Sequence, residues 1–146
     1  MRRHRAANAY SLLEVVMASA ICATALVPAL AFMRDGMTLA TTIDTKHMLL
    51  TYAVSKMEEQ LAVVGATWAE GTIAGDFAVD GHPNIRFAAV TSDAPVSGGI
   101  DGRLMNLVVT TYSDDNANDV MDAAEARITV TTKISKLMSY ENKASG

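Results

Sequence analysis

The chain has 146 residues and a formal net charge of −4, from 12 Lys and Arg against 16 Asp and Glu. This length accommodates one small domain, and the acidic balance argues against non-specific binding to nucleic acid or to an anionic membrane surface. The single cysteine, Cys22, excludes an intrachain disulfide.

A basic leader precedes a long apolar run at the N-terminus. The leader carries Arg2, Arg3 and Arg5 and ends in the small residues 6–9. Residues 15–33 contain no charged side chain and, at about 1.5 Å of rise per residue, are long enough to cross a hydrocarbon core of roughly 30 Å. Because basic residues beside an apolar span tend to stay in the cytoplasm, the sequence predicts a cytoplasmic N-terminus and an external C-terminal part.

One carboxylate, Glu14, lies at the entrance of this run, shortly after Ala9 and Tyr10. The arrangement resembles the processing signal of type IV pilins and type II secretion pseudopilins. In that family a basic leader ends in a small residue, usually Gly, followed by an aromatic or Met and then by a Glu before a long apolar helix. Here Ala9 stands in place of Gly, and Tyr10 in place of Phe or Met. The resemblance implies cleavage after Ala9 and N-methylation of Tyr10.

The resemblance also implies a function, that of a structural subunit of a pilus-like filament and specifically of a minor pseudopilin in a type II secretion-like system. Its partners would be other pilin or pseudopilin subunits, a prepilin peptidase and an inner-membrane assembly platform. The chain would cross the inner membrane once, with its C-terminal domain in the periplasm, before entering a periplasmic or surface filament. The absence of a second cysteine favours the pseudopilin branch, because many type IV pilins close a C-terminal loop with a disulfide.

Glu14 needs a partner, because a charge at the centre of a membrane helix costs about 2.5 to 3.5 kcal/mol, and less near an end. The resemblance implies that this partner is the freed Tyr10 ammonium of an adjacent subunit, which would set the axial register between neighbouring helices. From the residues alone, it is equally reasonable that the carboxylate reaches the cytoplasmic headgroups.

Two other hypotheses explain the N-terminus. In the first, it is an ordinary secretory signal in which the helix breaker Pro28 precedes an A-x-A site, so that cleavage after Ala31 releases a small β domain with Phe32 at its N-terminus. Such a secreted domain could bind calcium. In the second, the leader stays uncut and the helix is a simple membrane anchor.

Beyond the apolar run, the spacing of apolar residues predicts an amphipathic continuation of the helix over 34–65, ending at Gly65. Pro28 predicts a kink within the membrane part. The predicted apolar face comprises Leu39, Ile43, Leu50, Val54, Met57, Leu61 and Val64.

The remaining residues, 66–146, alternate in the manner of strands. We expect strands at 72–79, 85–91, 104–112 and 127–134, separated by turns and by a loop at 92–102, and a loose tail at 140–146. The strand at 104–112 is apolar on both faces and is therefore predicted to be central. The fold class is thus α+β: leader 1–9, assembly helix 10–33, its amphipathic continuation 34–65, and a three- to four-stranded antiparallel sheet packed on that continuation.

An acidic segment at 114–125 matches much of the calcium-loop pattern, in which oxygen ligands alternate along a tight turn and a distant carboxylate closes the shell. The sixth position is Asp119 instead of glycine, and the flanking segments read as strands instead of helices. The alternative is a solvated hairpin loop without metal. The candidate calcium ligands are Asp114, Asn116, Asn118, Val120, Asp122 and Glu125.

Catalytic signatures are lacking in the sequence. The three histidines, His4, His47 and His82, have no metal-ligand partner at helical or hairpin spacing. Neither a G-x-S-x-G motif nor a phosphate-binding glycine loop occurs. The sequence therefore predicts a protein that is not an enzyme and requires no cofactor, with calcium as the one candidate ligand.

Overall fold

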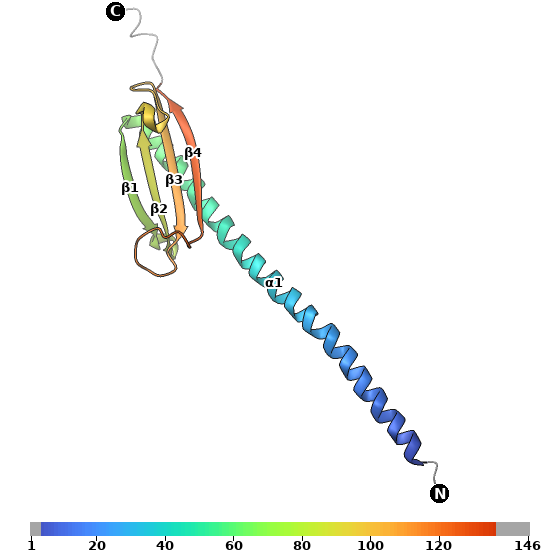
Figure 1. Cartoon of the computed structure of the whole chain (residues 1–146). Helices are drawn as coiled ribbons and strands as arrows, with labels where there is room; N and C mark the ends of the chain where they lie inside the picture. The colour runs from blue at the N-terminus through green and yellow to red at the C-terminus, as the bar shows by residue number, and fades with distance from the viewer. Residues whose placement is uncertain (1–3, 137–146) are drawn as a thin grey trace, which may run out of the picture. The chain divides into compact units, whose positions relative to one another are not determined.

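The computed structural model describes residues 4–136, with side chains described for 11–136. Within that range the chain forms one long helix followed by four strands (Figure 1). The elements are α1 (His4–Thr67), β1 (Gly71–Phe77), β2 (His82–Ser92), β3 (Leu104–Ser113) and β4 (Arg127–Ser135), with short 3-10 helices η1 (Ala78–Asp80) and η2 (Pro95–Ser97) in the connections. The chain divides into two compact units, Met1–Ile43 and Asp44–Gly146. The predicted loose tail at 140–146 lies outside the described residues.

The four strands form one antiparallel sheet in the order β1-β2-β3-β4. The α+β class is therefore confirmed, and β3 has a neighbour on each side, as its two apolar faces predicted. On the face of β3 that is directed to the core, four residues are fully buried: Met105, Leu107, Val109 and Thr111. This side of the sheet is called its inner face. Three residues of β4 lie opposite this row in the register and share its face: Ile128, Val130 and Ile134. The alternation of residues along β4 thus gives the strand one largely apolar, half-buried face and one polar, exposed face.

The last third of α1, which belongs to the unit 44–146, packs on this inner face of the sheet. Met57 forms a buried cluster with Ala89, Leu107 and Val109. The buried stripe of the helix recurs every three or four residues, as one face of an α-helix requires. It comprises Leu49, Ala53, Met57, Gln60 and Val64.

The predicted apolar face of the helix is partly wrong. Leu50 remains 45% exposed and Val54 41%, and the buried stripe runs through their neighbours Leu49 and Ala53 instead. The small side chain of Ala53 lets the helix backbone approach the sheet closely, which a larger residue would prevent. Hydrophobicity ranks Val54 above Ala53 and does not distinguish Leu50 from Leu49, so it could not indicate which residues face the sheet. Further along, Met57 and Val64 are buried as predicted.

The helix also ends later than predicted. Gly65 remains within α1, and the turn that ends the helix is made by Trp68, which has a left-handed φ of 47°. The Trp68 N–H donates to the carbonyl of Val64 at 2.9 Å, and its indole N–H donates to Asp93 at 3.4 Å. These bonds hold a conformation that glycine adopts more readily. Pro28 lies inside α1 and does not end it.

Candidate functional site

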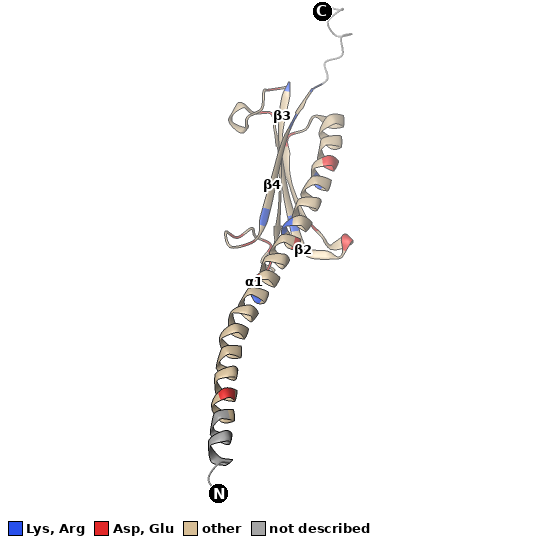
Figure 2. Cartoon of the chain, turned by 90° about the vertical axis from the view of Figure 1, so that its right-hand side faces the viewer, with Lys and Arg blue, Asp and Glu red and all other residues tan. Residues whose placement is uncertain are grey.

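The first candidate site is the apolar part of α1. From Ser11 to Ile43 every side chain is exposed, including large apolar ones such as Phe32 at 79%. This is the one helix among the described residues that is long and apolar enough to cross a membrane, and it lies near the N-terminus. Figure 2 shows how few charged residues this part of the helix carries. A contiguous apolar surface of this kind needs lipid or other protein to cover it.

Polar side chains in the apolar run are satisfied by the helix itself. The Ser19 hydroxyl donates to the carbonyl of Val16 at 2.8 Å, and the Thr24 hydroxyl donates to that of Ile21 at 2.9 Å. Such internal bonds make hydroxyls tolerable without water. Glu14 differs, because no described side chain pairs with it and it is exposed on the helix.

The predicted processing site lies at the start of the same helix. Both Ala9 and Tyr10 belong to the backbone of α1 (His4–Thr67), while their side chains lie outside the described ones. Arg2 and Arg3 lie outside the described residues altogether. Tyr10 precedes Glu14 by one helical turn, so the predicted new amine and the carboxylate belong to the same end of the apolar run.

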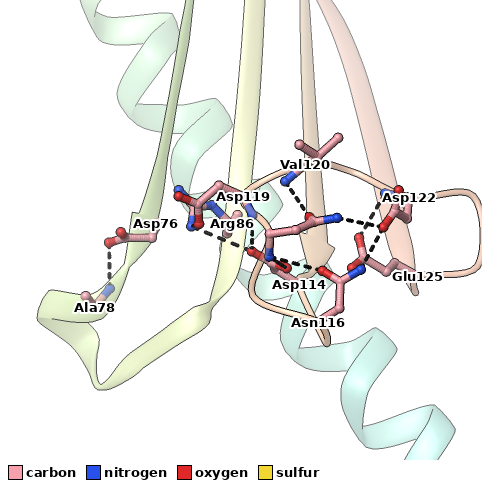
Figure 3. A network of polar contacts seen from close by, with 10 residues as sticks. Asp76, Ala78, Arg86, Asp114, Asn116, Asp119, Val120, Asp122 and Glu125 are labelled. Carbon is pink, nitrogen blue, oxygen red and sulfur yellow. Dashed lines mark hydrogen bonds and ion pairs between the residues drawn. The ribbon is translucent and has the colours of Figure 1, made fainter.

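The second candidate site is the loop between β3 and β4, which carries all six predicted calcium ligands (Figure 3). Two of its carboxylates are buried: Asp114, at the start, is 4% exposed, and Glu125, near the end, is 9% exposed. Burying two carboxylates in a surface loop is unusual, because charged side chains normally stay in water unless they are paired. The other four candidate ligands are exposed or half-buried: Asn116, Asn118, Val120 and Asp122.

Side chains at alternate positions fold this loop back on its own backbone. The carboxylate of Asp114 accepts the N–H groups of Asn118 at 3.1 Å and of Asp119 at 3.0 Å. The side-chain oxygen of Asn116 accepts the Asn118 N–H at 3.1 Å, and that of Asn118 accepts the Val120 N–H at 2.8 Å. The result is a tight turn with the alternating side chains directed to its inside.

The sixth position of the calcium-loop pattern, Asp119, makes the sharp turn although it is not glycine. Asp119 adopts a left-handed φ of 63°, and Ala117 also has a positive φ, of 55°. Aspartate tolerates this region better than most residues other than glycine. The backbone therefore makes the sharp turn that glycine usually permits.

The far side of the loop is held by amide groups and by one unusual carboxylate. The amide nitrogens of Asn116 and Asn118 donate to the same oxygen of Asp122, at 2.8 and 3.0 Å. The Asp122 N–H donates to Oε2 of Glu125 at 3.0 Å. The other oxygen of Glu125, Oε1, is buried and has no hydrogen-bond partner. One half of a buried carboxylate is thus left unsatisfied.

Arg86 on β2 is the residue near this loop that the sequence analysis missed. Its guanidinium forms an ion pair with Asp119 and lies 3.7 Å from a carboxylate oxygen of Asp114. The arginine lies far upstream of the loop in sequence, and only the pairing of β2 with β3 brings it there. No local pattern could have indicated it.

A second polar cluster was missed at the opposite end of β2. Asp93 accepts hydrogen bonds from the Gly102 N–H at 2.8 Å and from the Trp68 indole at 3.4 Å, while the carboxylate of Glu70 accepts the Asp93 N–H at 2.8 Å. The Gly102 N–H, as the largest cause, lowers the pKa of Asp93 below its ordinary value of 3.8, and the Trp68 bond acts in the same direction. Partial burial opposes this change. The cluster joins the end of α1 to the β2–β3 connection.

Among the described residues, no three His, Cys, Asp or Glu side chains are grouped so that they could hold a metal ion on their own. A cation in the loop would therefore need amide and backbone oxygens as well as carboxylates. Comparisons with protein-family models, with curated proteins and with solved structures found no match.

Proposed function

We propose that this protein is a structural subunit of a pilus-like filament, a minor pseudopilin of a type II secretion-like system, made as a precursor that a membrane peptidase cuts after Ala9. The observation that carries the proposal is the exposed apolar surface of residues 15–33, with the carboxylate of Glu14 directly before it. Before assembly, lipid of the inner membrane would cover this surface. In the filament, the apolar helices of neighbouring subunits would cover it.

Glu14 distinguishes an assembly helix from a plain membrane anchor. A carboxylate in this position costs free energy in lipid, and an anchor gains nothing from it. Among packed helices the same carboxylate can pair with an ammonium group, and in a low dielectric that pairing is strong enough to favour one axial register. Cleavage after Ala9 would create the required ammonium at Tyr10, which a neighbouring subunit would offer to Glu14.

The polar groups of the apolar run leave Glu14 as the residue that needs a partner. The Ser19 and Thr24 hydroxyls donate hydrogen bonds within their own helix and therefore need no partner on a neighbouring helix. Glu14 is the one Asp, Glu, Lys or Arg side chain between Ser11 and Met33, and its charge would direct how two helices align. The apolar surface would thus hold neighbouring helices together, and the charge of Glu14 would set their axial alignment.

The N-terminus of the mature protein tests the proposal directly. Mass spectrometry of the protein purified from its native membranes should find N-methylated Tyr10 as the first residue. A first residue of Phe32 would instead show that an ordinary signal peptidase releases the sheet domain after Ala31. An intact leader would show a membrane anchor that is not processed. Either result would overturn the proposal.

The role of Glu14 is tested separately with a matched pair of variants. Glu14→Gln keeps the size and polarity of the side chain but removes its charge, whereas Asp35→Asn removes a charge from the same helix beyond the apolar run. Each C-terminally tagged variant is purified from membranes, and co-purifying pilin-like subunits are quantified. Since breaking a buried ion pair costs several kcal/mol, Glu14→Gln should lower recovery by at least about tenfold, and Asp35→Asn should not. Equal recovery would contradict the register role.

A further inference from the structure

We propose that the two open edges of the sheet, β1 and β4, pair with each other between copies of this chain, so that the sheet of one copy continues into the next. The occupant of each edge is thus a second copy, anchored beside the first through its own apolar helix. Among the described strands, β1 pairs with β2 alone and β4 with β3 alone, which leaves both at the edges (Figure 1). The inference concerns the sheet domain and does not depend on cleavage after Ala9.

Both edges carry backbone groups that are open to a further strand. In the described chain, no backbone group outside the sheet bonds to β1 or β4. At one end of β4 the Ser113 N–H donates to the Ala126 carbonyl. At the other end the Lys136 N–H donates to the Arg103 carbonyl, so the even-numbered residues of β4 bond to β3. The odd-numbered residues therefore direct their N–H and C=O groups outward, where they can bind another strand.

The two edges carry opposite charges. Arg127 on β4 and Asp76 on β1 are both exposed, and neither forms an ion pair with another described residue. They stand at the two ends of one row across the sheet: Asp76 is opposite Arg86, Arg86 is opposite Tyr112, and Tyr112 is opposite Arg127. If the row continues into a second copy, Asp76 of that copy lies beside Arg127. With four strands in each copy, the alternation of bonded and non-bonded pairs continues across the junction.

A second row of the sheet gives a second pair of opposite charges in the same register. Ser92 lies opposite Asn106, and Asn106 lies opposite Lys133. The carboxylate of Glu70, directly before β1, accepts the Ser92 hydroxyl at 2.8 Å and so stands at the other end of this row. In the continued sheet, Glu70 of the second copy would meet Lys133. Lys133 also donates to the Gly98 carbonyl at 2.7 Å, so the pair would share an ammonium that is already held in place.

The same charges disfavour pairing between like edges. Two β1 strands related by a two-fold axis at the middle of the strand would set Glu70 against Asp76. Two β4 strands related in the same way would set Arg127 against Lys133. Like charges directly opposite each other destabilise a sheet, whereas opposite charges stabilise it. The pairing is therefore between different edges, and such a head-to-tail contact can repeat from copy to copy.

The inner face of the sheet supports the same register. Ile73 on β1 is 41% exposed, and Val130 on β4 is half-buried. They end a third row, in which Ile73 is opposite Ala89 and Val109 is opposite Val130. Continuing this row would bury Ile73 of the second copy beside Val130. A slip by one residue would turn Ile73 to the other face of the sheet and separate the charged pairs.

The packed helices leave room for this arrangement. Met57 of α1 packs on Ala89, Leu107 and Val109, so the helix covers the two central strands. Four strands span about 19 Å, which exceeds the helix diameter of about 10 to 12 Å. An edge of seven residues is smaller than a standard protein interface. The contact therefore suits copies that a membrane already keeps at a high effective concentration.

Disulfide cross-linking of the full chain in its native membranes tests the pairing. Ala74→Cys and Thr129→Cys are combined in one chain with Cys22→Ala, which removes the native thiol. The continued rows place the two new cysteines opposite each other at the junction, with Cα atoms about 5.5 Å apart, within disulfide range. Within one copy they are three strand spacings apart, about 14 Å, and cannot bridge. Mild oxidation should give a ladder of linked dimers, trimers and larger species.

The matched control combines Ala74→Cys with Ser135→Cys in the same background. Ser135 is exposed on the same strand but lies about 20 Å beyond Thr129. The ladder should be at least about tenfold weaker in this control, because a gap of that length exceeds the reach of a disulfide. The absence of a ladder from the first pair, an equal ladder in the control, or linkage to a different protein would each overturn the proposal.

Charge reversal tests the pairing of Arg127 with Asp76. Added to the cross-linking chain, Arg127→Asp should lower the ladder yield roughly three- to tenfold, because it replaces an attraction by a repulsion between cross-strand neighbours. Adding Asp76→Arg as well should restore the yield. Arg103→Asp, an exposed position away from both edges, should leave it unchanged. An undiminished ladder in Arg127→Asp, or no recovery in the double reversal, would contradict the assigned register.

The result is distinguishable from a failure of the proposed function. The uncut precursor presents the same two edges, so the ladder does not require processing. N-methylated Tyr10 found together with an absent ladder would overturn edge pairing alone. A ladder formed by a chain with an intact leader would support edge pairing and contradict the filament subunit.

Discussion

The hydroxyl of Thr111 on β3 donates a hydrogen bond to the backbone carbonyl of Leu49 on α1 at 2.8 Å, and both residues are fully buried. A helix carbonyl ordinarily accepts the N–H four residues later, so Leu49 uses its second lone pair for the sheet. The bond requires the helix backbone to lie close to β3. It thereby fixes both the rotation and the axial position of residues 44–67 on the sheet.

Replacing Thr111 by Val should measure what this bond contributes. Val has nearly the same shape, and Leu49 keeps its intrahelical donor, so we expect a loss of about 1 kcal/mol in the free energy of unfolding. The control is Thr129→Val, which removes an exposed hydroxyl pair with Thr110 and should cost less. Chemical unfolding followed by Trp68 fluorescence gives both values, and equal losses would contradict the role of the buried bond.

Substituting Leu49 and Leu50 in turn should show which face of the helix packs on the sheet. Leu49→Ala removes a fully buried side chain and should cost about 2 to 5 kcal/mol. Leu50→Ala alters a side chain that is 45% exposed and should cost less than about 1 kcal/mol. The difference in free energy of unfolding between the two variants is the measurement. A larger loss for Leu50→Ala would show that the predicted face, and not the observed one, meets the sheet.

Gly99 in the β2–β3 connection should tolerate no side chain. A Cβ at this buried position would overlap the backbone carbonyl of Asp93, which cannot move aside as a flexible side chain could. We expect Gly99→Ala to lower the free energy of unfolding by about 1 to 3 kcal/mol. Gly71→Ala is the control, because a Cβ there meets nothing within 4 Å. Similar effects from the two substitutions would be inconsistent with the observed packing.

Asp93 should make the stability of the sheet domain depend on acidic pH. The Gly102 N–H lowers the pKa of Asp93 in the folded protein below its ordinary value of 3.8, so the unfolded chain takes up the proton more readily. The stabilisation is present above that ordinary value and is lost as pH falls through the lower pKa of the folded state. Asp93→Asn should therefore flatten the acidic limb of the stability profile measured by urea unfolding. An acidic limb in Asp93→Asn as steep as that of the wild type would contradict this role of Asp93.

Several features could be predicted from the sequence because they depend on neighbours along the chain. The apolar run and its single carboxylate, Glu14, follow from composition over one segment. Alternation separates the two faces of β4, and the apolar character of both faces marks β3 as interior. The alternating oxygen-bearing side chains from Asp114 to Glu125 are likewise a local pattern of the sequence.

The tertiary structure decided the features that join distant segments. Whether Leu49 or Leu50 faces the sheet depends on how closely Ala53 lets the backbones approach, because hydrophobicity cannot distinguish two leucines. The pairing of β2 with β3 places Arg86 beside the acidic loop. Burial of Glu125 with one oxygen unpaired likewise appears only in the folded chain. A period along the chain shows which residues can share a face, but burial and charge pairing depend on what packs against that face.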